Sequence, residues 1–169
     1  AYFSSFSSTW IEHAKQFVLQ MIKKLNLKKD SFVVEVASND GYLLQFMTLH
    51  DIPCLGVEPA SETANVAVGK GINVINDFFT VELAQKIVGD YKKADLVIAN
   101  NVLAHVPDPE QMLRGIHSLL SDNGVASIEF QSLKDLIEKL AIDTIYHEHF
   151  SYYSLTSFKK IAEFSGLKV

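Results

Sequence analysis

The fold is decided by residues 32–41, which read FVVEVASNDG. Residues 32–37 (FVVEVA) are rich in valine, are apolar except for Glu35 and do not alternate, a pattern typical of a strand that is buried on both faces. The small residues that follow predict a turn into a helix, where backbone N–H groups can approach a ligand closely. Only one glycine is present, so an ordinary strand-to-helix turn is the alternative interpretation. The residues expected to contact a ligand here are Glu35, Ala37, Ser38, Asn39 and Gly41.

Strand-like and helix-like patterns alternate along the rest of the chain. Apolar runs that predict further strands lie at 54–57, 72–75, 95–99 and 125–130. Helical periodicity lies between the strands, at 42–49, 61–68, 81–88 and 109–120. This alternation indicates βαβ units and predicts an α/β fold, a mostly parallel sheet with helices on both faces.

Two further helices flank this core. Thr9 and Glu12 have the spacing of a capping box, so we expect a helix to begin at Thr9, in an N-terminal segment (residues 1–29) that packs on the core. A last helix is expected over 156–165, and Gly124 is expected to end the helix before the fifth strand. We interpret residues 1–169 as one domain.

Composition excludes several classes of protein. The chain has 169 residues, of which 48% are hydrophobic, so it can bury a core. Its net charge is −5 and its basic residues form no run, which together argue against nucleic acid as a partner. No apolar stretch approaches the roughly 20 residues of a membrane span, and we predict a cytoplasmic protein. The lone Cys54 predicts a small buried residue and no zinc site.

Polar residues follow each predicted strand, at the edge where open parallel sheets bind ligands. Glu58, ahead of Pro59, comes about 20 residues after the first turn, where a carboxylate accepts the ribose hydroxyls of a nucleoside. After the third strand, Asp77 offers an acceptor for an adenine amino group beside Phe78. A helix cap at Asp77 is the alternative. The turn and Glu58 together favour a nucleoside-type cofactor.

After the fourth strand, residues 100–108 (NNVLAHVPD), beginning with Asn100 and Asn101, resemble the segment that class I methyltransferases place under the methionine part of S-adenosylmethionine. Three further stretches are similar to the sugar C-methyltransferase family of deoxysugar biosynthesis: 34–44 (VEVASNDGYLL), 127–131 (SIEFQ) and 143–154 (DTIYHEHFSYYS). The opening 2–10 (YFSSFSSTW) and 13–14 (HA) match as well.

The resemblance implies a Rossmann-like methyltransferase that uses S-adenosylmethionine to methylate a carbon of a nucleotide-linked keto-deoxysugar. It implies His149 as the base, with Tyr146 and Glu148 positioning the base or the substrate. It also implies that His105 lines the same pocket; a satisfied structural histidine is the alternative. No metal is required.

The sequence departs from that family in two places. The family usually has an amino-terminal zinc-binding module of paired cysteines and a carboxy-terminal domain that helps to hold the nucleotide-sugar. This sequence has one cysteine and ends at Val169, so we expect a truncated core or a smaller relative. We also expect the last strands of the sheet to be incomplete, which leaves the fifth strand with an unpaired edge.

The block from Tyr146 to His149 has its own chemical logic. Imidazole has an unperturbed pKa of about 6.5, so a neutral histidine can take a proton at cellular pH. A carbon beside a ketone loses a proton only when a base removes it and the enolate oxygen is stabilised. Four polar side chains in a row cannot all be buried unpaired. We expect flanking apolar bulk to pin the segment against the domain, supplied by Ile145, Phe150, Tyr152 and Tyr153.

Three other functions compete with this interpretation. Methylation of an oxygen or nitrogen on another small molecule uses the same cofactor motifs. A catalytically silent cofactor-binding module is compatible with so short a chain. A nicotinamide-binding protein is disfavoured, because the second and third glycines of G-x-G-x-x-G are missing.

Overall fold

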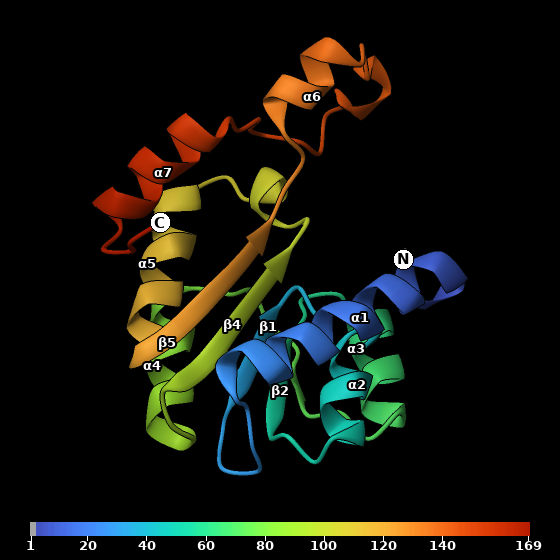
Figure 1. Ribbon diagram of the computed structural model, residues 1–169, viewed down its shortest axis with the longest axis vertical. Helices are drawn as coiled ribbons and strands as arrows, with labels where there is room; N and C mark the ends of the chain where they lie inside the picture. Colours follow the sequence, from blue (N-terminus) through green and yellow to red (C-terminus); the bar gives the residue numbers. More distant parts are fainter. Residues whose placement is uncertain (1–2) are drawn as a thin grey trace.

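Five parallel strands form the sheet at the centre of the molecule (Figure 1). The computed structural model describes residues 3–169. The strands lie side by side in the order β3-β2-β1-β4-β5, so strand order reverses between β1 and β4. Their bounds are β1 (Val33–Val36), β2 (Cys54–Val57), β3 (Val74–Ile75), β4 (Ala94–Asn100) and β5 (Leu120–Glu129). The predicted Rossmann-like α/β fold is therefore confirmed, and its reversal point is where open sheets of this kind bind ligands.

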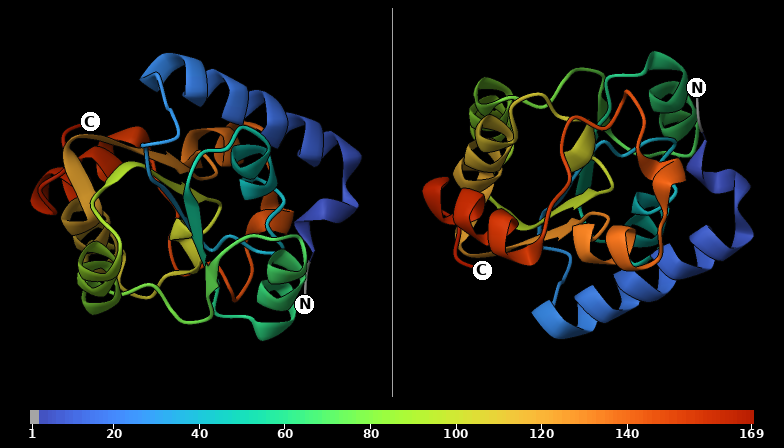
Figure 2. Two further views of the ribbon diagram at one scale, coloured as in Figure 1. Left: turned by 90° about the horizontal axis from the view of Figure 1, so that it is seen from below. Right: turned by 90° about the horizontal axis from the view of Figure 1, so that it is seen from above.

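Helices cover both faces of the sheet (Figure 2). One face is covered by α1 (Ser8–Leu25), α2 (Leu44–Leu49) and α3 (Ser61–Gly69), and the other by α4 (Val81–Asp90), α5 (Pro109–Leu119) and α7 (Leu155–Phe164). Side chains alternate along β1, so that Val33 enters the core under α1 while Val34 and Val36 enter the core under α5. Among the described residues, no helix is both long and apolar enough to cross a bilayer.

The shorter elements gather at the carboxyl ends of the strands. They are η1 (Ser4–Phe6), η2 (Leu103–His105), α6 (Leu133–Glu138) and η3 (Ile142–Thr144). The segment from 132 to 153, which holds α6 and η3, projects above β4 and β5 (Figure 1). Its two ends meet, because Ser132 and Tyr153 form an isolated bridge and the Leu133 N–H donates to the Tyr153 carbonyl at 2.9 Å.

Several predicted boundaries were wrong. Helix α1 begins at Ser8, and its cap is Ser7, whose hydroxyl accepts from the Trp10 N–H at 3.3 Å; Thr9 is already helical. Helix α2 begins at Leu44, two residues after the predicted start at 42, because the turn before it includes Gly41 in left-handed conformation. Strand β3 is confined to Val74–Ile75. Cys54 is only half-buried.

Gly124 does not end a helix. Helix α5 stops at Leu119, and Gly124 lies inside β5, where the register jumps from the pair Ala94 and Leu120 to the pair Leu96 and Val125. A Cβ atom at Gly124 would lie 2.6 Å from the Ala94 carbonyl oxygen, so glycine allows this irregular crossing.

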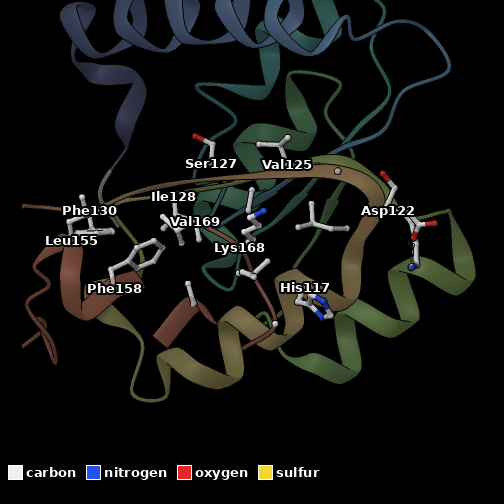
Figure 3. A pocket seen from close by; sticks show the side chains of 18 residues that line it. His117, Asp122, Val125, Ser127, Ile128, Phe130, Leu155, Phe158, Lys168 and Val169 are labelled. Carbon is white, nitrogen blue, oxygen red and sulfur yellow. Dashed lines mark ion pairs between the residues drawn. The ribbon is translucent and has the colours of Figure 1, made fainter. Parts of the chain in front are cut away.

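The outer edge of β5 is open, as expected from the sequence. Within residues 3–169, β5 pairs with β4 alone. A groove of about 860 Å³ runs along this edge, between β5 and α7 (Figure 3). Val125, Ile128, Phe158 and Val169 line it, and it contains none of the predicted site residues.

Candidate functional site

The turn after β1 is wound in an unusual way. Ala37, Asn39 and Gly41 all have positive φ, at 58°, 51° and 74°. Residues with a Cβ atom adopt this left-handed conformation only at an energetic cost, of order 1–3 kcal/mol each. The turn is held to the end of β2 by two bonds: the Ser38 N–H donates to the Val57 carbonyl at 3.2 Å, and the Asn39 N–H donates to the Glu58 carboxylate at 2.9 Å.

Gly41 is expected to be essential for this turn. A Cβ atom there would lie 2.3 Å from Ile72 Cδ1, whereas at Gly71, which also has positive φ, it would meet nothing within 4 Å. We expect Gly41→Ala to lower the free energy of unfolding by roughly 2–4 kcal/mol, through strain and overpacking together. Gly71→Ala, the matched control, should cost only about 1–2 kcal/mol. Urea denaturation of both variants measures the difference, and equal losses would contradict the packing argument.

Glu58 lies where the sequence predicted, against the turn after β1. It is 6% exposed, and its two carboxylate oxygens accept from the backbone N–H groups of Asn39 and Ala60, each at 2.9 Å. An ionised carboxylate has about four acceptor positions, so capacity for ribose hydroxyls remains. Pro59 follows in an exposed turn.

Asn76 ties the ends of β2 and β3 together, a role that the sequence did not indicate. Its side-chain amide donates to the carbonyls of Glu58 at 2.7 Å and Pro59 at 3.0 Å, and its oxygen accepts from the Ser61 hydroxyl at 2.8 Å. Asp77 and Phe78 lie exposed just beyond. The helix-cap alternative for Asp77 is wrong, because Thr80 caps α4. The adenine-binding role of Asp77 and Phe78 stays a prediction.

Buried polar atoms gather where β1 ends. Both carboxylate oxygens of Glu35, the Ser38 hydroxyl and one oxygen of Asp40 are buried without a hydrogen-bond partner among the described residues. Burial raises the pKa of Glu35 well above its usual range, and the nearby charges of Glu58 and Asp40 raise it further. This group of acids suits a ligand that carries positive charge and hydrogen-bond donors.

Asp40 was quoted in the turn motif but not predicted as a site residue. It is fully buried, lies 3.5 Å from the Lys70 ammonium, and accepts hydrogen bonds from the backbone N–H and hydroxyl of Ser5. The Ser4 N–H donates to the Asn39 side chain at 3.0 Å. The N-terminal segment therefore lies directly over the turn after β1, although Tyr2, part of the resemblance, lies outside the described residues.

A second group of side chains lies above β4 and β5. The ring of His149 is 4.2 Å from that of Tyr146, 4.7 Å from that of His105 and 5.9 Å from that of Tyr152, measured between centroids. His105 and Tyr146 are thus brought to His149 as predicted. Together these three residues line a cavity of about 650 Å³ that Trp10, Asn101 and Glu129 also line.

Backbone contacts fix the orientation of His149. Its Nδ1 lies 2.8 Å from the Thr144 carbonyl oxygen, which can only accept, so Nδ1 carries a hydrogen, and in the neutral ring Nε2 then has the lone pair. The Phe150 N–H donates to the Ala104 carbonyl at 2.8 Å and joins the segment to η2. Burial lowers the pKa of His105, and the neighbouring His149 lowers it further.

Part of the predicted pinning was wrong. Ile145 and Phe150 are 56% and 60% exposed, in the segment that projects above the sheet (Figure 1). Tyr153, one of the four predicted residues, is only 4% exposed, and it holds the segment together with the backbone bond of Phe150. Glu148 is exposed. Its catalytic role stays a prediction.

Glu129, at the end of β5, was also missed as a site residue. Asn101, in left-handed conformation with φ of 52°, donates to it twice: its backbone N–H to the Glu129 carbonyl and its side chain to the Glu129 carboxylate, both at 2.8 Å. The carboxylate is also 3.7 Å from His13 Nε2 on α1. Asn100, the last residue of β4, is half-buried.

Comparison with known proteins identifies the family of the chain. Residues 10–169 match a family model described as a methyltransferase domain. The C-methyltransferase NovU of Streptomyces niveus is 34% identical over 99% of this chain, which spans 40% of the length of that relative. Among solved structures, the YcgJ protein of Bacillus subtilis superposes with a TM-score of 0.70 at 16% identity, over 91% of this chain and 68% of that one. A SAM-dependent methyltransferase of Archaeoglobus fulgidus gives 0.67 at 19% identity, over 90% and 68%.

Proposed function

Because the chain belongs to the methyltransferase domain family, whose cofactor is S-adenosylmethionine, we propose that it methylates a carbon of a nucleotide-linked keto-deoxysugar. The observation that carries the proposal is the orientation of His149. Its Nδ1 donates to the Thr144 carbonyl, which leaves Nε2 unoccupied, and its ring lines a cavity at the carboxyl ends of β4 and β5. Similarity over nearly the whole chain to a relative named as a C-methyltransferase supports a carbon as the acceptor.

The residues at the ends of β1 and β2 fit S-adenosylmethionine. Glu58 would accept its ribose hydroxyls, and the buried acids Glu35 and Asp40 would face its positive charges. The left-handed turn at 37–41 brings backbone close to the ligand, and Asn100 and Asn101 would lie under its methionine part. When bound, S-adenosylmethionine supplies an electrophilic methyl group that the substrate carbon takes as the carbon–sulfur bond breaks.

The cavity residues would generate the nucleophilic carbon. Nε2 of His149 removes the proton beside the ketone, and the electron pair moves into the enolate, whose charge rests on oxygen. Tyr146 lies against His149, and its hydroxyl can donate a hydrogen bond to that oxygen. Burial lowers the pKa of His105, which favours its neutral form beside His149.

Two measurements test this function. A keto-deoxysugar linked to a nucleoside diphosphate, incubated with the protein and S-adenosylmethionine, should gain a methyl group that stays on carbon when the product is analysed by NMR. The same sugar with its ketone reduced to an alcohol should gain none, because no enolate can form. Methylation of the reduced sugar would instead indicate transfer to oxygen.

Loss of the Glu58 carboxylate should weaken cofactor binding. We expect Glu58→Ala to raise the dissociation constant for S-adenosylmethionine at least tenfold, since a hydrogen bond to a charged group contributes about 1.5–3 kcal/mol. Titration calorimetry measures the constant, and Glu163→Ala on α7, an exposed carboxylate paired with Lys159, is the control. A change of less than twofold would show that Glu58 does not hold the ribose.

A further inference from the structure

We propose that Glu129 receives hydroxyl groups of the sugar that is methylated, with Trp10 as a wall of the same binding site. The inference rests on the proposed function and deepens it, because it assigns substrate recognition to residues that take no part in proton transfer. Both side chains line the cavity that His105, Tyr146 and His149 line.

The Glu129 carboxylate is held in place but is not saturated. The Asn101 side chain donates to its Oε1 at 2.8 Å, and His13 Nε2 lies 3.7 Å from its Oε2. A carboxylate accepts about four hydrogen bonds, so further positions stay open toward the cavity. Its side chain is 39% exposed, which lets a ligand reach it. Hydroxyl groups are the donors that a sugar offers in number, and a carboxylate accepts from two neighbouring hydroxyls at once.

A purely structural role explains these contacts less well. A half-exposed pair such as His13 and Glu129 adds little stability. Asn101 already fixes the neighbouring strand end through its backbone bond to Glu129. The side-chain bond from Asn101 therefore serves mainly to orient the carboxylate, which is what a recognition group requires.

Trp10 is fixed beside this carboxylate. Its ring stacks on that of His13 at 5.3 Å between centroids and on that of Tyr42 at 6.3 Å, with interplanar angles of 21° and 27°. An aromatic ring held in this way offers a rigid apolar wall against which the C–H groups of a sugar pack at low entropic cost. Helix α1 thus supplies Trp10, which lines the cavity, and His13, which contacts the cavity residue Glu129.

The test compares Glu129→Gln with wild type in the protein loaded with S-adenosylhomocysteine. We expect the dissociation constant of the nucleotide-linked keto-deoxysugar to rise about tenfold or more, while that of S-adenosylmethionine changes less than twofold. Glu12→Gln, an exposed carboxylate beside His13 that does not line the cavity, should match wild type. Thermal unfolding confirms that each variant is folded, and Glu129→Asp provides a second variant if the glutamine form is not.

A substrate analogue makes the test specific. A series of keto-sugars is used, each without one ring hydroxyl. For at least one of these analogues, wild type and Glu129→Gln should have the same dissociation constant. Equal affinity of Glu129→Gln and wild type for the intact sugar would overturn the inference, as would a parallel loss of cofactor affinity. If wild type binds the cofactor but neither binds nor methylates the sugar, the proposed function itself fails.

Discussion

Replacing His149 with asparagine is expected to stop exchange of the acidic carbon-bound proton of the keto-sugar with solvent. General-base catalysis typically contributes 10²–10⁴-fold, so turnover should fall by roughly that factor. Asparagine can still donate to the Thr144 carbonyl, which His149 contacts at 2.8 Å, but it offers no basic nitrogen toward the cavity. NMR of the substrate in deuterated water, without methyl donor, measures the exchange directly.

His147 provides the matched control. It lies in the same segment, two residues before His149, and its side chain is exposed. His147→Asn should leave exchange and turnover close to wild type, and both variants should bind S-adenosylmethionine normally. Wild-type exchange in His149→Asn would remove His149 as the base, whereas loss of folding in that variant would favour a structural histidine.

Glu35→Gln should make the ligand-free protein more stable and the cofactor bind less tightly. The Glu35 carboxyl is 1% exposed, has no hydrogen-bond partner among residues 3–169, and faces the acids Glu58 and Asp40. Burying such a group costs about 1–3 kcal/mol, and a neutral amide of the same shape avoids the cost of ionisation. S-adenosylmethionine, which carries positive charge, should lose at least tenfold in affinity for the variant.

The stability gain should depend on pH in one direction. The folded-state pKa of Glu35 is raised above its unfolded value of about 4.3. The free energy of unfolding of the wild type is therefore highest below the unfolded-state pKa. It decreases as pH rises from there through the folded-state pKa. The advantage of Glu35→Gln should be smallest near pH 4 and should grow as pH rises. Urea unfolding from pH 4 to 8 measures the trend, and an advantage that shrinks with pH would contradict the assignment.

The sequence predicted the sheet well because its strands are buried on both faces. Stretches such as Val33–Val36, rich in valine and without alternation, favour strands of this kind, and their alternation with helices left few topologies. The wrong predictions had two causes, contacts between distant residues and a choice between neighbouring caps. Nothing local distinguishes Gly124 at a helix end from Gly124 beneath the Ala94 carbonyl, and both Ser7 and Thr9 are acceptable caps.

In the candidate site, too, residues with a local sequence signal were predicted and residues that depend on distant contacts were missed. Glu58 and the turn at 37–41 were predicted together because they occur at a known spacing after strands. Asn76 and Glu129 were missed because their hydrogen-bond partners are distant in sequence. Ser61 is 15 residues from Asn76, and Asn101 is 28 residues from Glu129. Only the folded sheet brings those strand ends side by side. The acidic residue Asp40 in a turn of small residues was a usable signal that was not followed.

The bridge between Ser132 and Tyr153 has a consequence for how such a protein can diversify. The segment it closes leaves and rejoins the domain at one point, and it carries Tyr146 and His149, while the buried acids Glu35 and Asp40 lie at the end of β1. A loop whose ends already touch can change length at little entropic cost. We therefore expect changes of length or sequence in residues 132–153 to alter the surroundings of His149 while the sheet and the turn after β1 keep their fold.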